Sequence, residues 1–318
     1  MPPTIKDSDY VTAPAGLNWK KIGRLKPPFG YYGAKQRLAS RIVAMLPPHN
    51  AWVEAFCGSA AVTFAKKPAR IEVINDRHGE IVNLFDQLRR NHEELCRAVT
   101  LTPYAREEFL TARLAQPRLS RLERARRFLV AAMMTVNGTI GNSCGFSFSS
   151  SFTRAGMEAR VSRWNNLPER LAQVAERLRL VRVENRDARE LLGMFSDRPA
   201  TLVYLDPPYL VKRDLDYVIE ANDHEFHEEL LELCCKARCM ILLSSYDTPL
   251  YRKMLPAKAG WRRKIIKTHT RDTTGKDHVR TEVLWLNKHF VNAARAGKVP
   301  IHLTRAELRE NKINPARP

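Results

Sequence analysis

The sequence alternates short apolar runs with amphipathic helical segments, and this alternation limits the folds open to the chain. The run 51–56 (AWVEAF) is apolar and too short for a helix, and Gly58 follows it before a helical segment that reaches residue 65. A second short run, 70–75, leads into a helical pattern over 79–90. Strand, glycine turn, helix and strand in this order predict a parallel sheet in an α/β protein.

The same alternation resumes in the second half of the chain. Helical patterns and apolar runs take turns at 168–178, 181–184, 188–195, 201–205, 224–236 and 239–243. Two late segments, 261–269 and 280–286, flank a polar stretch and predict a hairpin.

Residues 91–166 break this pattern. They are rich in helical patterns and arginine, and they continue into a Gly/Ser/Asn stretch with several phenylalanines (TVNGTIGNSCGFSFSSSF). We interpret them as an inserted domain that faces nucleic acid. The predicted organisation is a lead-in over 1–24, a catalytic domain from 25–90 and 167–290, the insertion over 91–166, and a basic tail over 291–318.

The charge balance indicates the kind of partner. The 318 residues carry 53 Lys and Arg against 34 Asp and Glu, a net charge of +19. Self-repulsion on this scale favours a polyanionic partner, nucleic acid before an anionic membrane surface. The longest apolar stretch, 128–136, is too short to span a membrane, and no secretory signal is visible. The six cysteines lack CxxC pairs, so we expect reduced thiols in a soluble cytoplasmic protein.

The first candidate site is the turn 54–60 (EAFCGSA) after the first apolar run. A glycine directly after a strand allows a ligand to approach the backbone, and the following helix start offers free N–H groups. Asp76 ends the next strand roughly 20 residues later, where an acidic residue accepts from ribose hydroxyls in dinucleotide-binding folds. The third glycine of that fingerprint is absent, so a tight turn without a ligand is the alternative.

The second candidate is Asp206-Pro207-Pro208-Tyr209, at the end of the apolar run 201–205. Ligands of open α/β sheets bind at the carboxyl ends of strands. The prolines stiffen the backbone, so the Asp206 carboxylate and the Pro207 carbonyl hold fixed directions. Two acceptors beside the Tyr209 ring suit a planar heterocycle with an exocyclic amine. A proline-rich loop without a ligand is the alternative.

A third segment, 29–35 (FGYYGAK), places two tyrosines and a glycine before Lys35 at a helix start. Lys35 can meet a carboxylate, and Tyr31 can pack on a sulfonium or a purine. Taken alone, this string is better explained as a surface loop.

Together and in this order, the three segments resemble the DNA N6-adenine methyltransferases of the Dam class (D12 family), which use S-adenosylmethionine. The resemblance runs from about residue 28 to 287 and includes RWNNLP at 163–168, ENRD at 184–187 and RTEVLW at 280–285. It departs at Ala34 and Ala60, where many members have glycine. A positive φ at either position would strain the backbone, with weaker cofactor binding as the worst expected outcome.

The resemblance implies a Rossmann-like methyltransferase sheet with an inserted helical target-recognition domain. It also implies the groups around the cofactor S-adenosylmethionine: Tyr31, Lys35, Phe56, Gly58, Asp76, Asp187 and Asp206. An adenine flipped out of double-stranded DNA would be held through N6 by Asp206 and the Pro207 carbonyl, and stacked on Tyr209. No metal is expected.

The insertion would then recognise DNA. Phosphate contacts, which give affinity without sequence information, are expected from Arg118, Arg121, Arg124 and Arg127. Asn137 and Asn142 would read base edges or fill the gap left by the flipped base. A solvated helix face is the alternative for the arginines.

Two other motifs lack the spacing that their chemistry needs, and several alternative functions stay open. His224 and His227 lack the HExxH spacing of a zinc site, and residues 244–246 lack a GxSxG elbow. A DNA-binding module that has lost turnover is the second hypothesis, and cytosine N4, RNA or protein glutamine are alternative acceptors. A cognate restriction endonuclease, a monomer or weak dimer, and a bacterial or phage-infected host complete the expectations.

Overall fold

The computed structural model describes residues 25–30, 35–114, 116, 118–136, 145–149, 151, 156–210, 224–271 and 277–300. The predictions for the lead-in over 1–24, for Tyr31, Ala34, Asn137 and Asn142, and for the tail beyond residue 300 lie outside these residues. No helix within the described ranges has both the length and the apolar character needed to cross a membrane.

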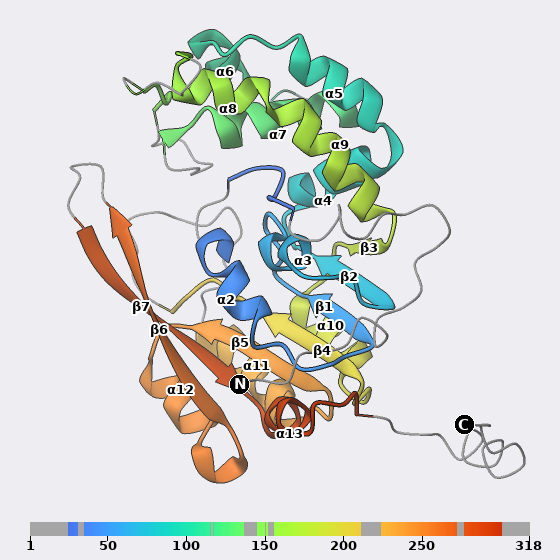
Figure 1. Cartoon of the computed structure of the whole chain (residues 1–318), viewed down its shortest axis with the longest axis vertical. Coiled ribbons are helices and arrows are strands. Elements are labelled where there is room, and N and C mark those ends of the chain that lie inside the picture. Colours follow the sequence, from blue (N-terminus) through green and yellow to red (C-terminus); the bar gives the residue numbers. More distant parts are fainter. Residues whose placement is uncertain are drawn as a thin grey trace, which may run out of the picture.

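A seven-stranded mixed sheet forms the centre of the molecule (Figure 1). Its strand order is β3-β2-β1-β4-β5-β7-β6. The strands are β1 Ala51–Glu54, β2 Ile71–Asn75, β3 Val181–Glu184, β4 Thr201–Leu205, β5 Met240–Ser245, β6 Arg262–Arg271 and β7 Asp277–Leu286. The first five strands in this order are parallel, and β7 runs antiparallel to both β5 and β6. The predicted α/β fold and the predicted late hairpin are confirmed.

Side chains alternate between the two faces of the sheet, as the two-residue period of a strand requires. On β1, Trp52 joins a core on one face, and Val53 joins a second core on the other. The helices α2 Ala39–Val43, α3 Ala61–Ala65 and α13 Lys288–Ala296 lie on the Trp52 face. The Val53 face is covered by α10 Ala188–Phe195, α11 His224–Lys236 and α12 Pro249–Met254.

The basic tail predicted from residue 291 onward begins inside helix α13. The helix continues to Ala296, and Phe290 and Ala293 are buried against the sheet. Part of the predicted tail therefore belongs to the packed fold.

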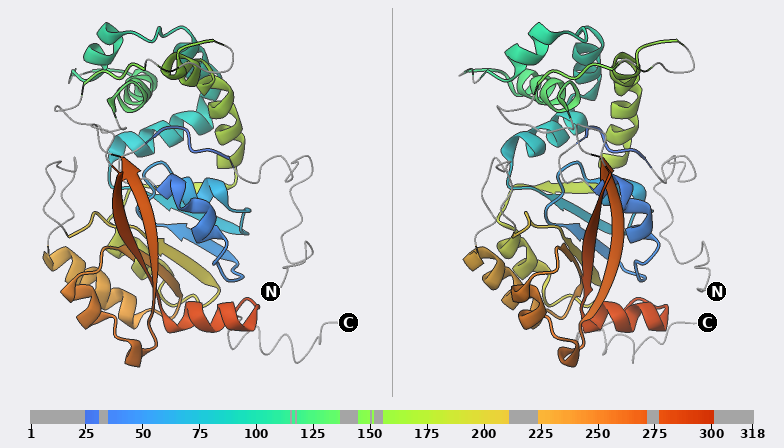
Figure 2. Two further views of the ribbon diagram at one scale, coloured as in Figure 1. Left: turned by 60° about the vertical axis from the view of Figure 1, so that its left-hand side comes forward. Right: turned by 90° about the vertical axis from the view of Figure 1, so that its left-hand side faces the viewer.

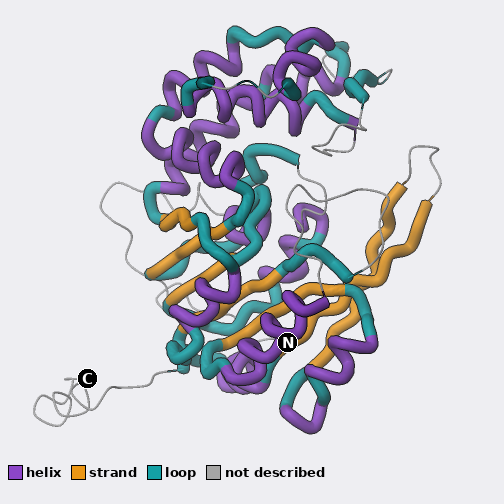
Figure 3. Tube along the Cα trace, turned by 180° about the vertical axis from the view of Figure 1, so that it is seen from behind, coloured by secondary structure: helices purple, strands orange, loops and turns teal. Residues whose placement is uncertain are grey.

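A helical part stands at the β3 end of the sheet, as Figures 2 and 3 show. It contains α4 Gly79–Arg90, α5 His92–Thr100, α6 Arg106–Ala112, α7 Arg121–Met133, α8 Ala159–Asn165 and α9 Leu167–Leu178. Helix α7 begins with a capping pattern in which the Ser120 hydroxyl accepts from the Glu123 N–H at 3.1 Å. The predicted helical character of this region is therefore observed.

The helical part and the sheet share one core. Leu88 of α4, Leu129 of α7 and Leu171 of α9 are buried in the same cluster as Phe64 of α3 and Ile74 of β2. Helices α4 and α9 make this connection, because α4 follows β2 and α9 precedes β3 in the chain. Among the described residues, no break in this core marks the boundaries predicted for the inserted domain at residues 91 and 166.

The strand order determines where a ligand site can form at the edge of the sheet. From β1 it passes to β2 and β3 on one side, then returns to β4 on the other side of β1. The loops after β1 and β4 therefore diverge at the carboxyl edge, which is where ligands of open α/β sheets bind. These two loops hold Gly58 and Asp206.

Candidate active site

The loop after β1 contains two residues in the left-handed region. Gly58 has φ 47° and Ala60 has φ 53°. Glycine adopts this conformation without steric cost, but alanine does not. The strain predicted for a positive φ at Ala60 is thus present in the structure, at the residue that caps α3.

Glu54 takes over the capping that Ala60 has no side chain to provide. Its carboxyl group accepts from the Thr63 N–H at 2.9 Å and from the Thr63 hydroxyl. Burial raises the pKa of Glu54 to about 8. The expectation of free N–H groups at this helix start needs correction, because Glu54 occupies the Thr63 donor. The sequence carried one signal for this capping role. Glu54 lies inside an apolar strand, where a carboxyl group needs a hydrogen-bond partner because an unpaired charge is costly.

Asp76 holds the loops after β1 and β2 together. Its Oδ2 accepts from the Gly58 N–H at 2.8 Å, and its Oδ1 accepts from the His78 N–H at 2.9 Å. Burial raises the pKa of this carboxyl group. Each oxygen keeps a second lone pair, so Asp76 can also accept from a pair of hydroxyl groups. Asp76, the residue expected at the cofactor ribose, therefore has acceptor capacity for two hydroxyl groups.

Asn75 is a contributor that the sequence analysis did not single out. Its amide donates to the carbonyls of Ala55 at 2.9 Å and Arg186 at 3.1 Å, and its oxygen accepts from the Arg186 N–H at 2.8 Å. One buried side chain therefore fastens the ends of β1, β2 and β3 to each other. Asparagine suits this place because it carries both donors and acceptors.

Lys35 and Asp206 form an ion pair, with 2.8 Å between Nζ and Oδ1. The two side chains are 8% and 15% exposed. The carboxylate that Lys35 meets within the chain is that of Asp206, and the expected contact of Lys35 with the cofactor stays a prediction. Burial raises the pKa of Asp206, and Lys35 opposes this rise. Tyr209 also contacts Oδ1, so Oδ2 is left without a hydrogen-bond partner among the described residues.

Tyr209 is held at both its hydroxyl and its ring. The hydroxyl lies 3.1 Å from Asp206 Oδ1 and donates to Glu282 Oε2 at 2.5 Å. Tyr246 packs edge-on with 4.5 Å between ring centroids, and Lys35 Nζ lies 4.9 Å from the ring centroid. Tyr209 is 6% exposed, so its ring is almost fully enclosed.

Phe56 and Asp187 lie on the side of the loops near α10 and α11. Phe56 packs edge-on against Phe226 of α11 at 6.2 Å. Asp187 caps α10 by accepting from the Arg189 N–H at 2.8 Å, and it pairs with the Arg189 guanidinium at 2.7 Å. Arg189 also lowers the pKa of Asp187. A cofactor amine would have to share Asp187 with Arg189.

The arginines predicted to contact DNA differ in their surroundings. Arg121 pairs with Asp86 at 2.9 Å and is 60% exposed, and Arg124 pairs with Glu80 and is 44% exposed. Both pairs join α7 to α4. Arg118 is exposed and has no ion pair within the described part of the chain.

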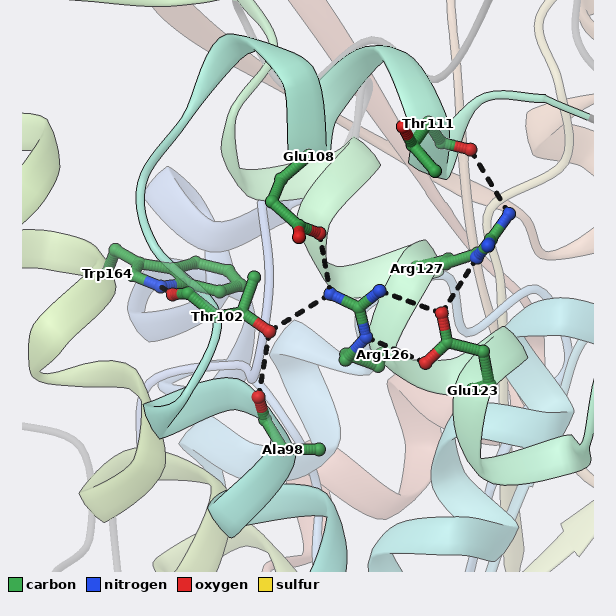
Figure 4. A network of polar contacts seen from close by, with 8 residues as sticks. All are labelled: Ala98, Thr102, Glu108, Thr111, Glu123, Arg126, Arg127 and Trp164. Carbon is green, nitrogen blue, oxygen red and sulfur yellow. Dashed lines mark hydrogen bonds and ion pairs between the residues drawn. The ribbon is translucent and has the colours of Figure 1, made fainter.

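Arg127, in contrast, is used for contacts between helices of the protein itself (Figure 4). It is 12% exposed, pairs with Glu123 at 2.8 Å and donates to the Thr111 carbonyl at 3.2 Å. The neighbouring Arg126 joins Glu123 to Glu108 at 2.7 and 2.9 Å. These two guanidinium groups stabilise the contact of α6 with α7, which leaves Arg127 little surface for a phosphate.

Comparison with known proteins identifies the family. The sequence model of the D12 class N6 adenine-specific DNA methyltransferases matches residues 31–267. One relative, the Type II methyltransferase M1.LlaDCHI of Lactococcus lactis subsp. cremoris, is 25% identical over 248 residues, which cover 72% of this chain and 84% of the relative.

Similarity to solved structures is low. A precorrin 8w decarboxylase from Methanobacterium thermoautotrophicum is 9% identical with a TM-score of 0.33, and it covers 89% of this chain and 100% of its own. A SAM-dependent methyltransferase from Agrobacterium tumefaciens is 9% identical with a TM-score of 0.34, covering 80% and 61%. TM-scores of this size are too low to support a statement about function.

The fold and the site agree with the family match. Lys35, Gly58, Asp76 and Asp206 all lie at the carboxyl edge of the sheet, inside the matched residues. The chain belongs to the D12 class N6 adenine-specific DNA methyltransferase family. The predicted enzyme class, DNA adenine methyltransferase, is confirmed.

Proposed function

We propose that the chain transfers a methyl group from S-adenosylmethionine to N6 of an adenine flipped out of double-stranded DNA. The observation that carries the proposal is the ion pair of Lys35 with Asp206, with the Tyr209 hydroxyl on the same carboxylate oxygen. This cluster adjoins the loop of Gly58 and Asp76 across the switch point of the sheet.

The cofactor, when bound, supplies a methyl group on a positively charged sulfur. Asp76 fits its ribose, and Gly58 allows the backbone to lie close to it. Phe56 and Asp187 are proposed for its adenine end, and Lys35 and Tyr31 for its methionine end. Asp76 supports this arrangement because its two oxygens are already fixed by backbone N–H groups.

The acceptor side depends on the orientation of Asp206. Because Lys35 and Tyr209 both contact Oδ1, the carboxylate presents Oδ2 to an approaching amine. Oδ2 and the Pro207 carbonyl would accept the two N6 hydrogens. This draws the amine away from conjugation with the purine and stabilises the positive charge that develops on nitrogen. Fixed geometry would supply much of the remaining rate.

On the DNA side, Arg118, Arg121 and Arg124 are proposed as phosphate contacts because they are exposed. Asn137 and Asn142 stay predictions for base contacts. A cognate restriction endonuclease, the monomeric or weakly dimeric state and the cytoplasmic location also stay predictions.

Methyl transfer from labelled S-adenosylmethionine to unmethylated plasmid tests the proposal. Asp206→Asn should lower the rate by at least about a hundredfold, because its amide offers one acceptor and no charge. Asp197→Asn should leave the rate unchanged, because this exposed carboxylate precedes the start of β4, whereas Asp206 follows its end. Mass spectrometry of the digested product should give N6-methyladenine. N4-methylcytosine, or equal rates for wild type and Asp206→Asn, would contradict the proposal.

A further inference from the structure

Glu282 lies at the same edge of the sheet as Asp206, although it comes from the hairpin. On β7, Val283 pairs with Ser245, the last residue of β5, so Glu282 is the first position beyond the carboxyl end of that strand. Leu284 belongs to the core on the Trp52 face and Val283 to the core on the other face. By strand alternation, Glu282 lies on the same face as Leu284.

The Tyr209 hydroxyl lies closer to Glu282 than to Asp206. The distance to Glu282 Oε2 is 2.5 Å, against 3.1 Å to Asp206 Oδ1. A phenol has one proton to donate, and the shorter contact assigns it to Glu282. Donation to a carboxylate makes this a strong, charge-assisted hydrogen bond.

The two carboxylates constrain Tyr209 in different ways. Asp206 is three residues earlier in the same turn, so the two side chains move together if the turn moves. Glu282 is 73 residues away and belongs to a different pair of strands. Its hydrogen bond therefore ties the turn after β4 to the antiparallel half of the sheet. Tyr246 limits the tilt of the ring from the side.

We propose that Glu282 is a positioning residue for methyl transfer, which fixes the Tyr209 ring beside the Asp206 carboxylate. The inference rests on the proposed function. A stacking surface and an acceptor contribute most when their geometry is set before the base arrives, since misplacement by about 1 Å can cost a hundredfold in rate. Reactive residues need such support from neighbouring side chains.

Four variants test this role through methyl transfer kinetics. Glu282→Ala should lower kcat about tenfold to a hundredfold, with the KM for S-adenosylmethionine and the Kd for duplex DNA within about twofold of wild type. Glu282→Gln should stay within about threefold of wild type, because its amide oxygen accepts the same hydrogen bond. Tyr209→Phe keeps the ring and loses the hydroxyl. If Glu282 acts through that hydroxyl, the Glu282→Ala/Tyr209→Phe double variant should be no slower than Tyr209→Phe.

The matched control is Glu232→Ala, which removes an exposed carboxylate on α11 and should leave kcat unchanged. Thermal unfolding of every variant checks that the fold is intact. Wild-type kcat in Glu282→Ala, a loss in Glu282→Gln as large as in Glu282→Ala, or multiplying effects in the double variant would each overturn the inference. Wild-type protein that transfers no methyl group to any DNA would instead overturn the proposed function.

Discussion

Replacement of Ala60 by glycine tests whether the loop after β1 stores backbone strain. Ala60 has φ 53° and ψ 38° and is fully buried. Its left-handed conformation costs about 1–2 kcal/mol, which glycine would recover. Glycine would lose about 0.8 kcal/mol from the buried methyl group and about 0.5–1 kcal/mol from backbone entropy. These opposing terms leave Ala60→Gly within about 1 kcal/mol of wild type.

The control is a buried alanine in right-handed helix. Ala125 of α7 is also fully buried, and there glycine brings no relief of strain. Ala125→Gly should cost about 2 kcal/mol from lost burial and helix propensity. Urea unfolding followed by circular dichroism measures both changes in the free energy of unfolding. An Ala60→Gly loss equal to that of Ala125→Gly would refute the argument that the loop is strained.

Two further predictions concern buried and exposed charges. The pKa of Glu54 is about 8 in the folded protein against an ordinary 4.5, so the folded state holds this proton more tightly than the unfolded state. The free energy of unfolding therefore falls as pH rises from 4.5 to 8. The free energy of unfolding of Glu54→Gln should therefore rise relative to wild type between pH 5 and 9, and a constant difference across this range would contradict the burial of the acid. For DNA, Arg118→Gln should reduce the slope of log K against log salt by about 0.9, whereas Arg127→Gln should lower the melting temperature and leave the slope unchanged. The reverse pattern, from equilibrium binding across a salt series and from thermal unfolding, would show that the phosphate contact belongs to Arg127.

The order of strands and helices could be read from the sequence because it depends on local patterns. Apolar runs of strand length, separated by helical periodicity, left a parallel sheet as the simplest arrangement. Once the sheet is parallel, the residues that follow β1, β2 and β4 must reach one edge. For that reason Gly58, Asp76 and Asp206 could be placed near one another, although they are far apart in the chain.

The ion-pair partners of the predicted residues depended on tertiary packing. The sequence showed that Lys35 could meet a carboxylate, but Asp206 became its partner only because the residues after Lys35, Leu38 and Ala39, share a core with β4. The arginines of α7 read alike in the sequence. Arg127 is nevertheless largely covered by its contact with α6, and Arg124 pairs with Glu80, 44 residues away.

The sequence by itself determined which segments become strands, which turns follow them and which chemical groups those turns carry, because each of these depends on neighbours within a few residues. Only the tertiary structure decided that Glu54 caps α3, that Asn75 joins three strand ends and that Glu282 reaches Tyr209. Such contacts depend on strand register and on the direction of side chains across the sheet, and a one-residue shift in register would move Glu282 to the other face.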